Sequence, residues 1–399
     1  MSSNEEGLVG PLSSDELARR WEAVRAGMRD RGIQALVLQA SNDWLGGYLR
    51  WFTGLPANNA YPRGIMFPLD GTMSLVQQGP FDGLTELDGT DAAYPGVGRL
   101  LTTPSYVSAA YTAQYDSDLI ATEVKRQGLT SIGLVAPAAM YHGFGTGLIA
   151  AFGEAGITVA DATDLVDEIK AIKSPEEQEL IRRTAKLQDE VFAAVCNHIR
   201  PGMRDFEVAA FAQHTAQLAG SEQGIYLGSS AALGHAAPFL PRWRQGREIR
   251  AGDVFTMLIE TNGPGGLYTE LSRPIVLGTA STELHDAWTL ALEAQENSLA
   301  LVKPGTPGAD IHAAHNAFMV AAGMPEEKRL YAHGQGHDMV ERPLIRQDET
   351  MRIAEGMNLT IHPSVKTDEV FVAVVDNYFV GPDGPGECLH GSPKEIIEI

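Results

Sequence analysis

Residues 357–365, MNLTIHPSV, place apolar and polar side chains in alternation along the chain. Asn358, Thr360 and His362 are polar, whereas the positions between them are apolar. A period of two is typical of a β-strand with one buried face. Pro363 favours extended backbone at the residue before it, which is His362. The segment is therefore predicted to be a strand that carries His362 on its polar face.

Similar strand-like segments lie on both sides of this stretch, separated by helical segments. The strand-like runs are DVFTMLIE (253–260), LYTELSRPIVLG (267–278) and VFVAVVDNYFV (370–380). Amphipathic helices are predicted for residues 173–195, 280–302 and 309–323. At the start of the first helix, a capping box is indicated by Ser174, Pro175 and Glu177. Helices combined with a largely antiparallel sheet indicate an α+β domain.

The first part of the chain has a different pattern. A capped helix is predicted for residues 13–32 and a buried strand for 33–40, and strands and helices alternate up to about residue 165. This alternation is typical of α/β domains. A chain of 399 residues is long enough for two domains. We therefore expect an α/β domain over residues 1–165 and an α+β domain over 166–399.

The composition restricts the classes of partner. The chain has 51 acidic and 30 basic residues and a net charge of -21, so nucleic acid and anionic membranes are not expected partners. The two cysteines, Cys196 and Cys388, form neither a disulfide framework nor a CxxC metal pair. No signal peptide and no apolar run long enough to span a membrane are visible in the sequence. We expect a cytoplasmic protein.

Several polar side chains interrupt apolar strands, where they must be paired, hydrogen-bonded or bound to metal. Asp376 lies in VFVAVVDNYFV and Glu270 in LYTELSRP, while Glu260 ends DVFTMLIE. A buried carboxylate without a partner is energetically costly. His333 and His337 lie in the segment YAHGQGHDMVERP, whose glycines suit a tight passage from strand to loop. These residues are the candidates for a functional site.

The order of several motifs resembles the creatinase/prolidase family, whose pita-bread fold is shared by methionine aminopeptidase, proline dipeptidase and creatinase. The resemblance rests on the segments EIKAIKSPEEQELIRRTAKLQDE, IRAGDVF, LYTELSRPIVLG, HGQGHD, GMNLTIHPSV and VVDNYFVGPDGP, which occur in the order of the family. It implies a pita-bread catalytic domain over residues 166–399. It also implies that residues 1–165 form the smaller N-terminal α/β domain of creatinase-like and aminopeptidase P-like proteins.

The resemblance also implies where metal ligands would lie. Peptidases of the family bind two divalent metals through two Asp, one His and two Glu. In this order, the ligands correspond in this chain to Leu258, Glu270, His337, His362 and Asp376. Glu260 replaces the missing first ligand only if the strand shifts locally. Because a histidine cannot bridge two metals as a carboxylate does, no dinuclear site is expected.

Two cofactor states remain open. Two imidazoles and two carboxylates suit a single zinc, iron or manganese ion, which would be held by Glu270, His337, His362 and Asp376. The other state has no metal, as in creatinase, which hydrolyses a C–N bond with a histidine and carboxylates. The counterpart of that catalytic histidine is His235, if the chain has an insertion after it.

The leading functional hypothesis is hydrolysis of a C–N bond in a small non-peptide molecule. Acid–base roles are expected for His362, His337 and His235, with Glu270 and Asp376 as electrostatic partners. Three alternatives remain: a metal-dependent Xaa-Pro aminopeptidase or dipeptidase, a lyase with one metal ion acting on a small cationic substrate, and a binding module without catalysis.

Substrate contacts are expected from residues of both domains. Arg273 and Arg342 are candidates for holding a carboxylate by bidentate contact. His333 lies in the glycine loop. Trp51 belongs to an aromatic group that is expected first as core of the N-terminal domain; because that domain covers the neighbouring site in creatinase-like dimers, the resemblance also allows Trp51 to form a wall of that site. The resemblance therefore implies a homodimer that acts on a small-molecule substrate.

Overall fold

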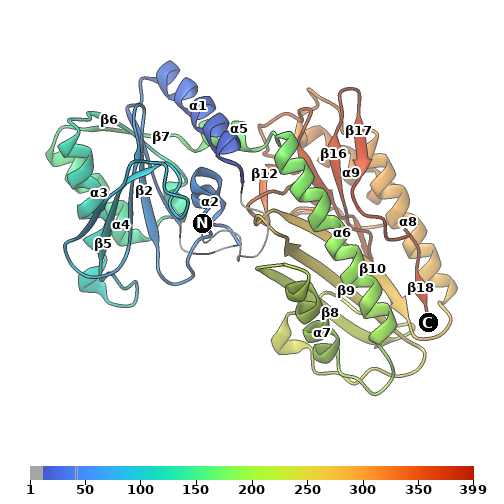
Figure 1. Cartoon of the computed structure of the whole chain (residues 1–399). Coiled ribbons are helices and arrows are strands. Elements are labelled where there is room, and N and C mark those ends of the chain that lie inside the picture. The colour runs from blue at the N-terminus through green and yellow to red at the C-terminus, as the bar shows by residue number, and fades with distance from the viewer. Residues whose placement is uncertain (1–11, 41, 43) are drawn as a thin grey trace. The chain divides into compact units, whose positions relative to one another are not determined.

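The computed structural model describes residues 12–40, 42 and 44–399. The chain folds into two compact units, Met1–Lys170 and Ala171–Ile399 (Figure 1). The domain boundary expected at residue 165 falls inside helix α5 (Thr163–Lys170), and the first unit extends to the end of that helix. Of the helices in the described part of the chain, none is long and apolar enough to cross a membrane.

The first unit is built around a seven-stranded sheet with the order β4-β5-β3-β2-β1-β6-β7. β1 pairs antiparallel with β2 and parallel with β6, so the sheet is mixed. Its strands are β1 (Ala35–Ala40), β2 (Arg63–Pro68), β3 (Met73–Gln78), β4 (Gly83–Glu86), β5 (Val97–Thr103), β6 (Ser131–Leu134) and β7 (Thr158–Asp161). Its other helices are α1 (Ser14–Arg31), α2 (Gly47–Thr53), α3 (Tyr115–Arg126) and α4 (His142–Glu154), with short 3-10 turns at Ala110–Thr112 and Pro137–Ala139.

The second unit combines four long helices with largely antiparallel sheets. The helices are α6 (Pro175–His198), α7 (Asp205–Leu218), α8 (Thr282–Leu299) and α9 (Gly308–Ala321), and a 3-10 turn covers Arg242–Arg244. One sheet has the order β18-β10-β9-β8 and contains β8 (Gly224–Ala232), β9 (Asp253–Asn262), β10 (Tyr268–Val276) and β18 (Ile397–Glu398). Helices α6 and α7 pack their apolar faces on this sheet (Figure 1).

A second sheet of this unit has the order β12-β11-β13-β16-β17. Its strands are β11 (Ala332–Gly334), β12 (Glu341–Leu344), β13 (Asn358–Ile361), β16 (Asp376–Val380) and β17 (Pro385–Cys388). Two short strands, β14 (Ser364–Lys366) and β15 (Phe371–Ala373), pair with each other. A bridge between Ser272 of β10 and Val375 joins the two larger sheets. The cavity of the candidate functional site lies where they meet.

The capping box predicted at the start of α6 is confirmed. The Ser174 hydroxyl accepts a hydrogen bond from the Glu177 backbone N–H, and the Glu177 carboxylate accepts one from the Ser174 backbone N–H. These two bonds satisfy donors that the first turn of a helix otherwise leaves unpaired. The start of the second unit is thus determined locally by its own sequence.

The strand predicted for residues 357–365 is divided in the structure. β13 ends at Ile361 and β14 begins at Ser364, with His362 and Pro363 between them. The polar face of β13 is not solvated as the alternation suggested, since Asn358 and Thr360 are almost completely buried and the Thr360 hydroxyl donates to the Glu270 carboxylate. The polar side chains of this strand therefore face the interior of the unit.

Candidate functional site

A cavity of about 300 Å³ lies where the two larger sheets of the second unit meet. Its polar lining includes Glu260 from β9, Glu270 from β10, His333 from β11, and His362 from the turn after β13. Most of the remaining wall is apolar and comes from Ile225, Leu227, Phe239, Leu258, Leu330, Val340, Phe371, Ala373 and Val375. Ionisable groups that converge on a cavity with partly apolar walls are typical of a catalytic or ligand-binding site.

Three of these residues are close enough to hold one metal ion. One ligand atom from each of Glu270, His333 and His362 lies within 4.8 Å of the others. His333 Nε2 is 3.9 Å from Glu270 Oε2, and the two imidazole rings are 5.2 Å apart between centroids. Thr360 of β13 connects the two residues. It lies opposite His333 in the pairing of β11 with β13, and its hydroxyl donates to Glu270 Oε2 at 3.2 Å.

The histidines are in the form that binds metals. His333 Nδ1 donates to the Gly334 carbonyl at 2.9 Å, so in the neutral ring the free lone pair is on Nε2, which lies 3.9 Å from Glu270 Oε2. Burial lowers the pKa of His333 to about 4. Burial and then the neighbouring His333 lower the pKa of His362 well below its ordinary value. Nε2 of His362 is inaccessible to solvent and has no hydrogen-bond partner among the described residues.

Glu260 and Glu270 form a pair of buried carboxylic groups. They lie opposite each other on β9 and β10, and the two residues are 5% and 6% exposed. Burial raises the pKa of Glu270 to about 7. Burial and then the charge of Glu270 raise the pKa of Glu260 well above its ordinary value. In the absence of a bound cation, such a pair retains a proton near neutral pH.

A chain of buried amides orients Glu260. Gln335 Nε2 donates to Glu260 Oε1 at 2.9 Å. Asn377 Nδ2 in turn donates to Gln335 Oε1 at 2.9 Å, while Asn377 Oδ1 accepts from the Glu270 backbone N–H at 2.8 Å. Because the Gln335 carbonyl oxygen is occupied by Asn377, its amino group must face Glu260. The glycine loop therefore supplies a positioning residue for the carboxyl pair.

Two predicted ligands are placed elsewhere. Asp376 accepts from Arg273 Nη2 at 2.6 Å and from Gln295 Nε2 at 3.2 Å, and it does not line the cavity. Since neighbouring side chains on a strand point in opposite directions, Val375 faces the cavity instead. His337 is buried in the loop after β11 and does not belong to the ligand group. Of the two histidines, only His333 lies on β11, the strand that pairs with β13.

The other predicted contacts are also not brought to this cavity. His235 is exposed in the turn after β8. Arg273 is completely buried and bound to Asp376, while Arg342 donates to the Glu349 carboxylate at 2.6 Å and lines a different surface pocket. Trp51 is buried in the core of the first unit. Each of the two arginines is thus already engaged by a carboxylate of its own unit.

Arg329 is the cationic residue of the cavity wall, and it was missed from the sequence. It is exposed, and no carboxylate of the described residues forms an ion pair with it. Burial dominates the pKa shifts of Glu260, Glu270, His333 and His362, and the charge of Arg329 additionally lowers each of these pKa values. The signal in the sequence was the charged run EEKR, residues 326–329, shortly before His333.

Comparisons with known proteins agree with this architecture. The profile of metallopeptidase family M24 matches residues 179–382. The Xaa-Pro dipeptidase of Pyrococcus furiosus is 25% identical over 239 residues, which are 59% of this chain and 67% of that protein. An uncharacterized peptidase of Bacillus subtilis, YqhT, is 24% identical over 241 residues, 58% of this chain and 65% of that protein. The match thus spans about two thirds of these relatives.

Solved structures share the fold along almost the whole chain. The X-Pro aminopeptidase of Thermotoga maritima has a TM-score of 0.78 at 18% identity and covers 95% of this chain and 99% of its own. The prolidase of Pyrococcus horikoshii has a TM-score of 0.74 at 18% identity, with 95% and 100% covered. The fold expected from the sequence motifs is confirmed. The chain belongs to metallopeptidase family M24, a family of hydrolytic enzymes with the pita-bread fold.

Proposed function

We propose that this chain is a hydrolase that cleaves the C–N bond of a small, carboxylate-bearing, peptide-like substrate with one divalent metal ion. The ion would be held by Glu270, His333 and His362. The observation that supports this most directly is the clustering of their ligand atoms within 4.8 Å. Xaa-Pro dipeptides are the first substrates to test, because the relatives named above include an Xaa-Pro dipeptidase.

The donor set fits one metal ion. Two imidazoles and a carboxylate leave coordination positions for water and substrate, as catalytic zinc and iron sites do. A bound ion would polarise the substrate carbonyl and lower the pKa of a water molecule. A second ion would find aliphatic side chains at Leu258 and Val375, which line the same cavity and carry no ligand atom. The proposal therefore departs from the dinuclear pattern of the family peptidases.

Glu260 is proposed as the general acid–base residue. It lies opposite Glu270 but outside the ligand group. A carboxyl group whose pKa is raised by burial and a neighbouring negative charge can accept a proton from water and return it to a leaving nitrogen. The hydrogen bond from Gln335 holds one oxygen of Glu260 in place during this transfer.

Arg329 is proposed to bind the substrate carboxylate. An arginine presents a planar fork of donors that matches a carboxylate, and Arg329 lines the cavity without an ion-pair partner among the described residues. The apolar walls formed by Leu330 and Phe371 suit an apolar ring, such as that of proline, beside that carboxylate. This assignment replaces Arg273 and Arg342 as carboxylate-binding candidates.

A second candidate is metal-free hydrolysis of a C–N bond in a non-peptide molecule. The carboxyl pair Glu260 and Glu270 favours it, because the two groups can divide acid and base roles without a cation. In that case His333 and His362 would be neutral hydrogen-bonding groups for the substrate. Arg329 would keep its carboxylate-binding role in both candidates.

The two candidates differ in metal content and substrate. Purified full-length protein is analysed for bound metal and assayed on Xaa-Pro dipeptides and on small cyclic and linear amidines. One metal equivalent, with dipeptide cleavage that chelator abolishes and metal restores, is expected. His362→Ala should lose the metal and the activity, whereas the exposed His235→Ala should keep both. Two metal equivalents would contradict the proposed site, and turnover of amidines by metal-free protein would favour the second candidate.

A further inference from the structure

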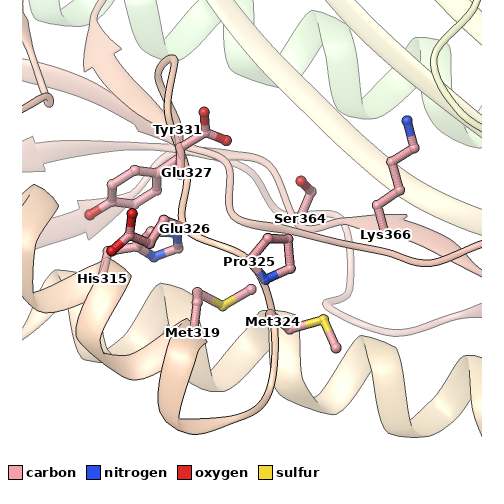
Figure 2. Close-up of a pocket in the computed structure, with 9 residues that line it drawn as sticks. All are labelled: His315, Met319, Met324, Pro325, Glu326, Glu327, Tyr331, Ser364 and Lys366. Atoms are coloured by element: carbon pink, nitrogen blue, oxygen red, sulfur yellow. The ribbon is translucent and has the colours of Figure 1, made fainter.

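The two faces of the sheet that carries Glu270 are filled differently. The Glu270 side chain lines the first cavity, and a further cavity of about 180 Å³ shares Glu327, Tyr331 and Ser364 with it (Figure 2). Neighbouring side chains on a strand point to opposite faces, so Thr269 points away from the first cavity. On that face α6 covers the sheet, and Thr269 is completely buried. Open space thus lies on the side of the Glu270 carboxylate, and packed side chains lie on the other.

Gln188 of α6 holds the strand at Thr269, the residue before Glu270. Gln188 Nε2 donates to the Thr269 carbonyl oxygen at 2.5 Å, and Gln188 Oε1 accepts from the Thr269 hydroxyl at 2.8 Å. Gln188 is completely buried on a helix face that is otherwise largely apolar. Because a buried amide is costly unless its polar atoms are bonded, these contacts fix the orientation of its side chain.

His390, which lies shortly after β17, joins Gln188 to Asn377. Its Nε2 is 2.9 Å from Gln188 Oε1, and its Nδ1 accepts from the Asn377 backbone N–H at 3.3 Å. A backbone N–H can only donate, so Nδ1 is the acceptor and Nε2 carries the proton. Burial lowers the pKa of His390 to about 4 despite the nearby charge of Asp376, so the imidazole is neutral near neutral pH. The two partners therefore determine the tautomer of His390.

These bonds close a ring around the peptide group between Thr269 and Glu270. His390 donates to Gln188, and Gln188 donates to the carbonyl oxygen of this peptide group. The N–H of the same group donates to Asn377 Oδ1 at 2.8 Å, and the Asn377 backbone N–H donates back to His390. Because every donor points the same way round the ring, each bond polarises the next and strengthens it. Removal of one member opens the ring.

The chain on both sides of His390 is anchored. The backbone N–H groups of residues 391–392 donate to the Asp189 carboxylate of α6 at 2.7 and 2.9 Å. The Leu389 backbone N–H donates to the Asn377 carbonyl oxygen at 2.9 Å. His390 is therefore held between α6 and β16 by its neighbours in the chain as well as by its own ring.

We propose that His390 is a positioning residue for Glu270 and acts through Asn377 and Gln188. The hydrogen-bonded ring fixes the peptide group from which the Glu270 side chain starts, so the carboxylate keeps its place beside the two histidines of the ligand group. His390 itself neither lines the first cavity nor belongs to the ligand group. This inference rests on the proposed function, because it takes Glu270 as a metal ligand.

The test is zinc titration of the metal-free, full-length protein. His390→Phe keeps a flat ring but removes both nitrogen atoms, and it should lower zinc affinity about tenfold, as loss of residues that hold metal ligands does. His390→Asn is smaller, but its amide oxygen can still accept the Asn377 N–H, so it should retain more affinity than His390→Phe. If His390 only filled space, the order would be the reverse, because the smaller side chain leaves a cavity.

Two further variants keep the test independent of whether His390→Phe folds. Gln188→Met opens the ring from α6 with a side chain of similar length and should also lower zinc affinity about tenfold. The control is Ser230→Ala, which removes a buried hydroxyl that donates to Asp205 at 2.6 Å and lines neither cavity. It should lower stability and leave zinc affinity unchanged. Thermal unfolding shows which variants are folded.

The outcomes separate this inference from the proposed function. Wild-type zinc affinity in folded His390→Phe or in folded Gln188→Met would overturn the positioning role and leave the hydrolase proposal intact. A lower affinity in His390→Asn than in His390→Phe, or an equal loss in Ser230→Ala, would do the same. A wild-type protein that binds no zinc would overturn the metal site of the proposed function and the positioning role together.

Discussion

Glu260 and Glu270 lie opposite each other on the antiparallel strands β9 and β10, and both are almost completely buried. Burial disfavours the charged form of the Glu260 carboxyl group, and the negative charge of Glu270 adds repulsion. Both effects raise the pKa of Glu260. Proteins tolerate such a pair where a cation or a shared proton compensates it. The pair is therefore the centre of the proposed catalytic site.

Glu260→Gln should remove the general acid–base group and keep the fold. Loss of general acid–base catalysis typically costs about 10²–10⁴-fold, so we expect kcat to fall by at least about 100-fold while the bound metal remains. The metal-free variant should also be more stable than the metal-free wild-type protein near pH 8, because the buried like-charge pair is gone. Steady-state kinetics, metal analysis and thermal unfolding check this, and a kcat within about twofold of wild type would exclude the assigned role.

Arg329→Gln should weaken binding of substrates that carry a free carboxylate. A hydrogen bond to a charged group contributes about 1.5–3 kcal/mol, so kcat/KM for an Xaa-Pro dipeptide should fall roughly 10- to 100-fold. The same dipeptide with an amidated carboxyl end serves as the control and should change little. Equal losses for the acid and the amide would show that Arg329 does not bind the carboxylate.

Asp376→Asn should destabilise the second unit without removing the metal. Asp376 and Arg273 form an ion pair with both side chains completely buried, and the Lys394 Nζ lies 3.5 Å from the other Asp376 oxygen. Breaking one partner of a buried pair typically costs about 3–5 kcal/mol. Urea unfolding measures this loss, and metal analysis of the folded variant measures the site. A folded variant that has lost its metal would restore Asp376 as a ligand.

His333→Ala and His337→Ala should differ in their effects on metal binding. His333 belongs to the ligand group and His337 does not, although both are buried. Mutating a residue that only hydrogen-bonds to a metal ligand already lowers metal affinity by about 10-fold or more. Removing His333, one of the three proposed ligands, should therefore lower the affinity by at least about 10-fold. Titration of each metal-free variant with zinc gives the affinities. A larger loss of affinity in His337→Ala than in His333→Ala would contradict the arrangement of the glycine loop.

Asp116→Asn should flatten the pH dependence of stability of the first unit. Burial raises the pKa of Asp116 to about 6, against a hydrogen bond from Ser105 that lowers it. Because the folded state then binds more protons than the unfolded state between about pH 4 and 6, wild-type stability should fall as the pH rises through this range, by up to about 3 kcal/mol. Urea unfolding at pH 4.5 and 7.5 compares the two proteins. The exposed Asp383→Asn is the control, and an unchanged slope in Asp116→Asn would refute the prediction.

Much of the local structure could be predicted from the sequence. The capping box of Ser174 and Glu177 begins α6 as predicted, because its hydrogen bonds join residues three apart in the chain. The motif order from residue 173 onward predicted the fold, which the family profile and the solved structures confirm. Glu270 was selected because a polar group within an apolar strand requires a partner, and His362 because the alternation of its strand and the family resemblance single it out.

The sequence did not predict which of these polar residues line the cavity. His333 and His337 lie in one short glycine loop, and Val375 and Asp376 are adjacent, so the sequence names each pair without choosing between its members. A shift of one residue on a strand reverses the direction of the side chain.

The sequence by itself thus determined the fold, the capped entry helix and the presence of acidic and histidine residues on particular strands, since these depend on local periodicity and motif order. Only the tertiary structure decided that His333 joins Glu270 and His362, that Val375 faces the cavity while Asp376 binds Arg273, and that Arg329 lines the wall. The physical reason is that these relationships depend on strand register and on the packing of segments far apart in the chain.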